Sequence, residues 1–77
     1  MKIEILERLR VIVKPAIDEE APMIAVTYKT DTGIVRTVWI DEEKATEENI
    51  QKLILADLEA IGVKPGEVEW IMKKGGS

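Results

Sequence analysis

The sequence of 77 residues contains no cysteine and no histidine. Disulfide bonds and metal sites built on cysteine are therefore excluded. Without histidine, the chain also lacks a common transition-metal ligand and the most frequent general base. Its only serine is the final residue, and its five glycines fit neither the Walker A loop nor the dinucleotide-binding fingerprint. We expect a non-enzymatic protein with no catalytic residues, no cofactor and no metal.

Long hydrophobic runs are also absent. No apolar stretch approaches the roughly 18 residues of a membrane span. Five charged residues among the first ten leave no room for the apolar part of a secretory signal. We therefore expect a cytoplasmic protein that does not contact a membrane. One asparagine and one glutamine, beside abundant glutamate, lysine and isoleucine, resemble the composition of heat-adapted proteins.

The negative charge is unevenly distributed. The chain carries a net charge of −4, and residues 41–63 alone contain seven acidic and two basic side chains. Nucleic acid is bound through basic surfaces that neutralise phosphates, so the acidic segment disfavours it. A nucleic-acid-binding domain is the third-ranked alternative. It would use basic residues on the sheet: Arg8, Arg10, Lys14, Lys29 and Arg36.

The length fits a single domain, for which we predict residues 1–74, followed by a disordered tail at residues 75–77. Such a short chain has a thin core, and small domains without disulfides often gain stability by oligomerising. Over residues 3–13, apolar side chains occupy most odd positions, with Glu7 as an interruption. This period of two favours a strand with one wetter face over the rival short helix. Residues 15–22, with a proline near each end, predict a loop.

The next segment predicts a β-hairpin. Two strands, Met23–Thr30 and Ile34–Ile40, flank Asp31-Thr32-Gly33, in which Gly33 can adopt the positive φ of a three-residue turn. If Thr30 opposes Ile34, the numbers of paired residues sum to 64. One face then forms the core, with Tyr28 opposite Arg36 in a stacking contact. The other face carries Thr27 opposite Thr37, Lys29 opposite Val35, and Ala25 opposite Trp39.

An amphipathic helix follows, with Thr46 as N-cap and Gly62 just after its end near Ile61. Residues 67–72 alternate again and predict a last strand parallel to the third. The chain is therefore expected to be an α+β protein with the order β-β-β-α-β. A single mixed sheet would carry the helix on one face. No motif is specific enough to transfer functional residues from a known family.

Asp57 is anomalous, because it falls inside the apolar stripe of the predicted helix. A carboxylate buried there needs a partner. We expect an ion pair with Arg8, Arg10 or Arg36, or a hydrogen bond to a backbone amide. A carboxylate kept for ligand binding is the alternative.

Trp39 is the second anomaly, because the predicted register places it on the face away from the helix. Exposed apolar patches often mark interfaces, and tryptophan is a frequent anchor there. Our leading hypothesis is a protein–protein interaction module that self-associates, as a homodimer or larger assembly, through this outer face or an edge strand. Its predicted interface residues are Met23, Ala25, Val35 and Trp39. The competing interpretation is a tryptophan packed under another part of its own chain.

An acidic run precedes the helix and enters its first turn. The second-ranked hypothesis is an adaptor or inhibitor that docks this run on a basic partner protein. The simpler interpretation is a solvated face whose charges suit the helix dipole. The residues of the run are Asp41, Glu42, Glu43, Glu47 and Glu48.

Overall fold

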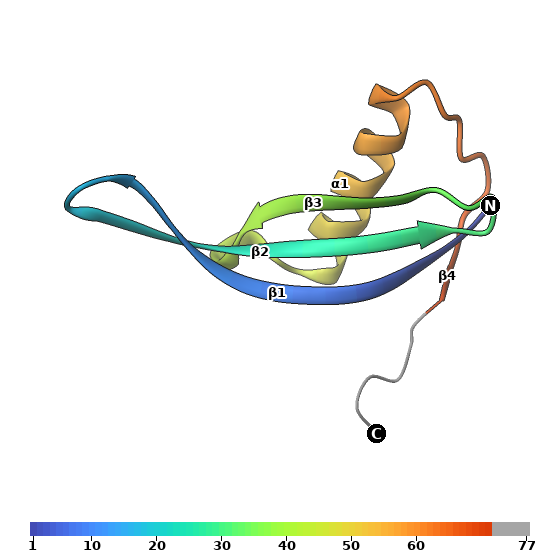
Figure 1. Cartoon of the computed structure of the whole chain (residues 1–77). Helices are drawn as coiled ribbons and strands as arrows, with labels where there is room; N and C mark the ends of the chain where they lie inside the picture. Colours follow the sequence, from blue (N-terminus) through green and yellow to red (C-terminus); the bar gives the residue numbers. More distant parts are fainter. Residues whose placement is uncertain (72–77) are drawn as a thin grey trace.

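The computed structural model describes residues 1–71, apart from the side chains of Pro15 and Ala16. The predicted tail, residues 75–77, lies outside the described residues. The elements in chain order are β1 (Lys2–Ala16), β2 (Glu19–Thr30), β3 (Val35–Asp41), the 3₁₀ turn η1 (Glu42–Lys44), α1 (Glu47–Ala60) and β4 (Glu69–Ile71). One mixed sheet has the strand order β3-β2-β1-β4, and α1 lies on one of its faces (Figure 1). The predicted α+β class and element order are confirmed.

The β2–β3 hairpin has the predicted register. Every pair from Met23–Asp41 to Lys29–Val35 sums to 64. Gly33 closes the turn with a φ of 92°, a value that glycine adopts without strain. The hydroxyl of Thr30 accepts a hydrogen bond from the N–H of Ile34 at 3.1 Å, which ties the two strands together at the turn. β3 begins and ends one residue later than predicted.

The core lies between the sheet and α1. From the sheet come Ile3, Val26, Tyr28 and Val38, and from the helix come Ile50, Ile54 and Leu58. Trp70 of β4 packs at the margin of this cluster. Within residues 1–71, no helix covers the opposite face of the sheet, called the outer face below.

The ends of α1 follow the predicted caps. The Thr46 hydroxyl accepts a hydrogen bond from the Asn49 N–H at 3.2 Å. At the other end Gly62 has a φ of 82°, and the N–H of Val63 donates to the carbonyl of Leu58 at 2.9 Å. These contacts satisfy backbone groups that a helix terminus leaves unpaired.

A β-bulge at Leu6 changes which β1 side chains face the helix. The β1–β2 register shifts there by one residue. Ile5 is paired with Tyr28 on the helix face, whereas Leu9 is paired with Ala25 on the outer face. The predicted alternation with one wetter face does not hold over the whole strand, because the extra residue reverses the two faces. Ile3 and Ile5 therefore face the helix, and Leu9, Val11 and Val13 face outward.

The predicted loop at residues 15–22 is wrong. β1 continues to Ala16 and β2 begins at Glu19, so only residues 17–18 form the turn. The two strands form an arm, residues 12–22, that extends past β3 and α1 (blue to teal in Figure 1). β3 stops pairing with β2 at Met23, so the arm has two strands only. It gives the molecule its elongated shape of 43 × 34 × 20 Å.

Backbone hydrogen bonds explain why Pro22 does not break β2. The N–H of Thr30 donates to the carbonyl of Ile34 at 2.8 Å, and the N–H of Asp31 donates to the carbonyl of Lys2 at 3.0 Å. Along β2, even residues thus face β3 and odd residues face β1. At Pro22 a backbone N–H would point to the side of β3. β3 has already ended there, so the N–H that proline lacks is not needed for pairing with β3.

β4 begins at Glu69, two residues later than the strand predicted at residues 67–72, and Met72 lies outside the described residues. It pairs in parallel with Lys2–Glu4 of β1. Because β1 and β3 are both antiparallel to β2, β4 runs in the same direction as β3, as predicted. Among the described residues, no helix has both the length and the apolar composition needed to cross a bilayer.

Candidate functional site

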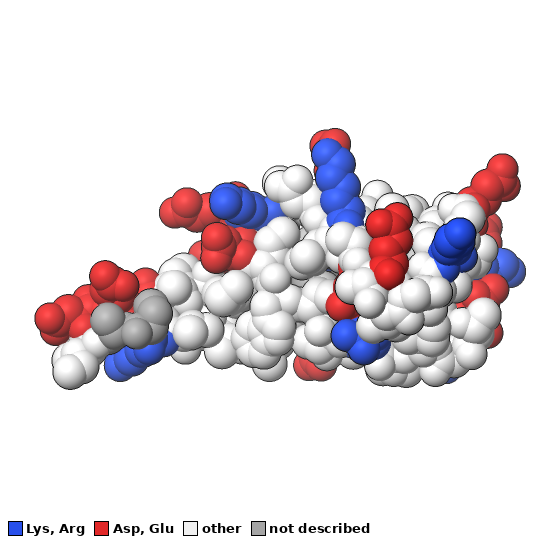
Figure 2. Space-filling model, turned by 90° about the horizontal axis from the view of Figure 1, so that it is seen from above, with Lys and Arg blue, Asp and Glu red and all other residues white. Residues whose placement is uncertain are grey.

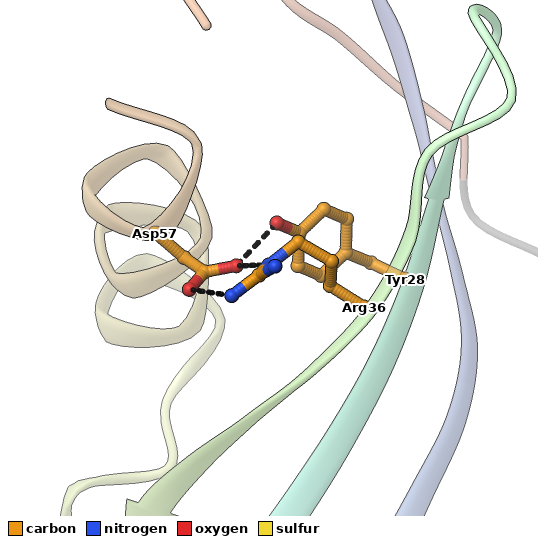
Figure 3. Close-up of polar contacts among 3 residues, drawn as sticks. All are labelled: Tyr28, Arg36 and Asp57. Carbon is orange, nitrogen blue, oxygen red and sulfur yellow. Dashed lines mark hydrogen bonds and ion pairs between the residues drawn. The ribbon is translucent and has the colours of Figure 1, made fainter. Parts of the chain in front are cut away.

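Asp57 of α1 receives side chains from both strands of the β2–β3 hairpin. Tyr28 donates its hydroxyl to Oδ2 of Asp57 at 2.6 Å. Arg36 donates Nε–H to the same oxygen at 2.6 Å and Nη2–H to Oδ1 at 3.3 Å. Figure 3 shows both side chains pointing from the sheet to the helix carboxylate. The predicted partner Arg36 is confirmed, and Tyr28 and Arg36, predicted to stack, are joined through Asp57.

This environment shifts the ionisation of both acids. The hydrogen bonds from Arg36, and then that from Tyr28, lower the pKa of Asp57, although partial burial opposes them. Burial first, and then the hydrogen bond to Asp57, raises the pKa of Tyr28 well above its ordinary value. Asp57 therefore stays ionised and Tyr28 stays a donor across the neutral range. The polar groups of Tyr28, Arg36 and Asp57 are thus paired with one another, and these contacts link the helix to the hairpin.

The outer face carries a row of apolar side chains across three strands. Leu9 of β1 is paired with Ala25 of β2, which is paired with Trp39 of β3. Leu9 is 53% exposed and Trp39 is 49% exposed, while Ala25 between them is buried. Val11 and Met23, the next pair toward the arm, are half-buried on the same face.

The four predicted interface residues all lie on this outer face but differ in exposure. Trp39 and Val35 are exposed, Met23 is half-buried, and Ala25 is covered by its neighbours. Val35 is separated from Trp39 along β3 by Thr37, so it stands apart from the apolar row.

Sequence reasoning missed the contribution of β1 to this face. Leu9 and Val11 extend the patch, but their orientation depends on the bulge at Leu6. The apolar residues keep odd numbers on both sides of the bulge, so their period gave no sign that the two faces are exchanged. The local trace in the sequence is the pair Leu6-Glu7, in which the apolar and the charged residue stand in the reverse of the surrounding order.

The acidic run is largely paired with basic side chains. Glu42 binds Arg10, Glu47 binds Arg8, and Glu48 lies 3.1 Å from Lys52. Within the described residues, Asp41 and Glu43 form no ion pair. The surface available to a basic partner is thus smaller than the count of five acids suggests.

The basic residues considered for nucleic acid do not share one face. Arg8 and Arg10 bind the acids of α1 and η1, and Arg36 binds Asp57, all on the helix side. Lys29 lies on the outer face beside Val35, and Lys14 is on the arm, 3.8 Å from Glu20. Seen from above, acidic side chains gather toward the end of the molecule where the arm tip lies (Figure 2).

Two surface depressions lined by described residues are open to solvent. One of about 140 Å³ lies where β1, β2 and β4 meet, and one of about 400 Å³ lies at the C-terminal end of α1. In the part of the chain that the structure describes, no three acids come close enough to hold a metal ion. No protein-family model, curated protein or solved structure matches this chain. The apolar patch of the outer face is therefore the best candidate functional site.

Proposed function

We propose that this chain is a small, non-enzymatic, cytoplasmic protein–protein interaction module that self-associates through the outer face of its sheet. The observation that carries the proposal is the exposed row of Leu9, Ala25 and Trp39 on a sheet face that no helix covers. In water this apolar surface is unfavourable, and its burial against a second apolar face is the simplest way to remove it.

The energetics favour Trp39 as the anchor of this contact. Tryptophan has a large apolar surface and few rotatable bonds, so its burial costs little conformational entropy for the area gained. Leu9 lies two strands away in the same row, and Ala25 between them keeps the patch flat. A flat, self-complementary patch suits an isologous dimer, in which the same surface of each copy meets the other.

The acidic-adaptor hypothesis has less support, because Glu42 and Glu47 are already engaged by arginines of their own chain. An adaptor that uses these acids would have to compete with that pairing. Nucleic-acid binding has less support for the same reason, because Arg8, Arg10 and Arg36 already bind acids of their own chain.

Replacing Trp39 with serine tests the proposal. We expect Trp39→Ser to raise the dissociation constant of the self-associated form by about 30-fold or more, because a tryptophan hot spot contributes about 2 kcal/mol or more. Sedimentation velocity over a micromolar dilution series measures the change, and circular dichroism verifies that the variant is folded.

Ile61→Ser is the matched control, since Ile61 is an exposed apolar residue (41%) at the end of the helix, away from the outer face. It should self-associate like the parent chain. An apolar contact should also persist as salt is raised, whereas acidic docking would weaken steeply. A parent chain that sediments as a monomer at all concentrations contradicts the proposal.

A further inference from the structure

Among residues 1–71, most of one backbone edge of β1 has no paired strand. β4 pairs with Lys2–Glu4, and no other described strand lies against that side of β1. From Ile5 to Ala16, β2 is therefore the one neighbouring strand within the described residues. A two-stranded ribbon such as the arm is marginally stable in water, and an open edge is a template for another strand.

The backbone pairing shows which residues present hydrogen-bonding groups to this edge. Odd residues of β2 face β1, and Val11 is paired with Met23, so the N–H and C=O of Val11 point toward β2. Its neighbours Arg10 and Ile12 therefore direct theirs away from β2, to the open side.

We infer that this edge of β1 pairs antiparallel with the same edge of a second copy, about a two-fold axis at Val11. Paired residue numbers in the two copies then sum to 22. The arm of each copy lies beside the body of the other, which gives the arm the third strand that it lacks. The inference extends the proposed self-association to a second surface, separate from the outer face.

Side-chain orientation limits the register of this pairing. Directly opposed residues share a face, so outward residues such as Leu9 and Val11 must meet outward residues of the partner copy. From Glu7 to Val13, between the two register shifts of β1, outward residues have odd numbers. Over this stretch, the numbers of two opposed residues must therefore add up to an even number.

Apolar matching and charge together select one register among those with an even sum, since only a sum of 22 pairs Leu9, Val11 and Val13 entirely with one another. A sum of 20 places Arg10 opposite Arg10, a sum of 18 places Arg8 opposite Arg10, and a sum of 24 places Arg10 opposite Lys14. Like charges directly opposed destabilise a strand pair. A sum of 22 instead places Arg10 opposite Ile12, Val11 opposite Val11, and Leu9 opposite Val13.

The remaining like-charged pair in this register, Arg8 opposite Lys14, falls at the end of the ladder. Acidic partners within the chain reduce the repulsion in every register, since Arg8, Arg10 and Lys14 each have one. The pair of Arg8 and Lys14 is distinguished by lying three residues from the axis, farther than the like-charged pairs of the other three registers. The two outer faces also join into one surface that is continuous at Leu9, Val11 and Val13.

A proline substitution tests the edge directly. Ile12→Pro removes one N–H that points to the open side, and it leaves the β1–β2 ladder intact because Ile12 donates nothing to β2. We expect this variant to lose the edge-paired dimer in sedimentation velocity while it keeps the circular dichroism spectrum of the parent chain. Ile12→Val retains the N–H and should behave like the parent.

Thr37→Pro is the control for proline itself. Thr37 lies in β3, and its N–H points to the other open edge of the sheet, because its partner Thr27 faces β1. This variant should keep the dimer. If Ile12→Pro still forms the same dimer, edge pairing at β1 is overturned.

Cysteine cross-linking tests the register, which the natural chain permits because it has no cysteine. At the proposed axis, the two copies of Val11 form a non-hydrogen-bonded pair with Cα atoms about 4.5 Å apart, within the range of a disulfide. Under mild oxidation, Val11→Cys should form a covalent dimer rapidly, and Leu9→Cys should not. Faster cross-linking through Leu9→Cys overturns the proposed register.

The outcomes separate this inference from the proposed function. If Trp39→Ser abolishes self-association and Ile12→Pro has no effect, the edge inference fails and the outer face remains. If Ile12→Pro abolishes self-association and Trp39→Ser has no effect, edge pairing is supported and self-association through the outer face is contradicted. If a chain ending at Ile71 dimerises while the full chain is monomeric, residues 72–77 occupy the edge themselves and the inference is overturned.

Discussion

Tyr28→Ala is expected to remove a large part of the free energy of unfolding. The tyrosine ring is fully buried in the core between sheet and helix, and its hydroxyl binds Asp57. Removal of a buried aromatic ring costs about 3–5 kcal/mol. A domain of this length has a total stability of about 4–11 kcal/mol. Urea denaturation followed by circular dichroism at 222 nm measures the loss.

Tyr28→Phe separates the ring from the hydroxyl. It keeps the packing of the ring and removes the hydrogen bond to Asp57, so it should cost only about 0.5–1.5 kcal/mol, or about 4–8 °C in Tm per kcal/mol. If the two variants were equally destabilised, the hydroxyl and not the ring would dominate. If neither were destabilised, the placement of Tyr28 in the core would be wrong.

Asp57→Asn is expected to lower the free energy of unfolding at neutral pH by about 1–2 kcal/mol. It should also make that free energy depend less on pH in the acid range. Since the folded protein lowers the pKa of Asp57 below its ordinary value of 3.8, its carboxylate stabilises the fold at pH values above that value. This stabilisation is lost as pH falls through the lower, folded pKa. Chemical denaturation at a series of pH values from 7 to 2 gives the profile of each protein.

The difference between the parent chain and Asp57→Asn should therefore be largest near neutral pH and shrink below pH 4. A difference that stays constant down to pH 2 would show that ionisation of Asp57 contributes nothing. Combining Asp57→Asn with Tyr28→Phe should cost less than the sum of the two single changes, because both remove the same hydrogen bond. Additive costs would contradict that contact.

Much of the fold was predictable because it depends on residues close together in the chain. Gly33 fixes a tight turn, and that turn fixes the register of the whole β2–β3 hairpin. Thr46 and Gly62 mark the ends of the helix through contacts within a few residues. The need of Asp57 for a partner was also evident, since a carboxylate in an apolar stripe is costly if unpaired.

The arm shows why a local signal can mislead. Two prolines within eight residues are typical of a loop, yet Pro22 is accommodated because β3 ends before reaching it. Whether a proline breaks a strand depends on whether a neighbour needs its missing N–H, and that neighbour is distant in the sequence.

The sequence by itself determined the class of fold, the hairpin register, the helix caps and the outward position of Trp39, because short-range sterics and the period of the apolar residues govern them. Only the tertiary structure decided that Arg36 and Tyr28 bind Asp57, that the bulge at Leu6 turns Leu9 outward, and that the described part of β4 pairs with Lys2–Glu4 of β1. These features arise from pairings between segments far apart in the chain, and one added residue in a strand is enough to reverse which side chains face the solvent.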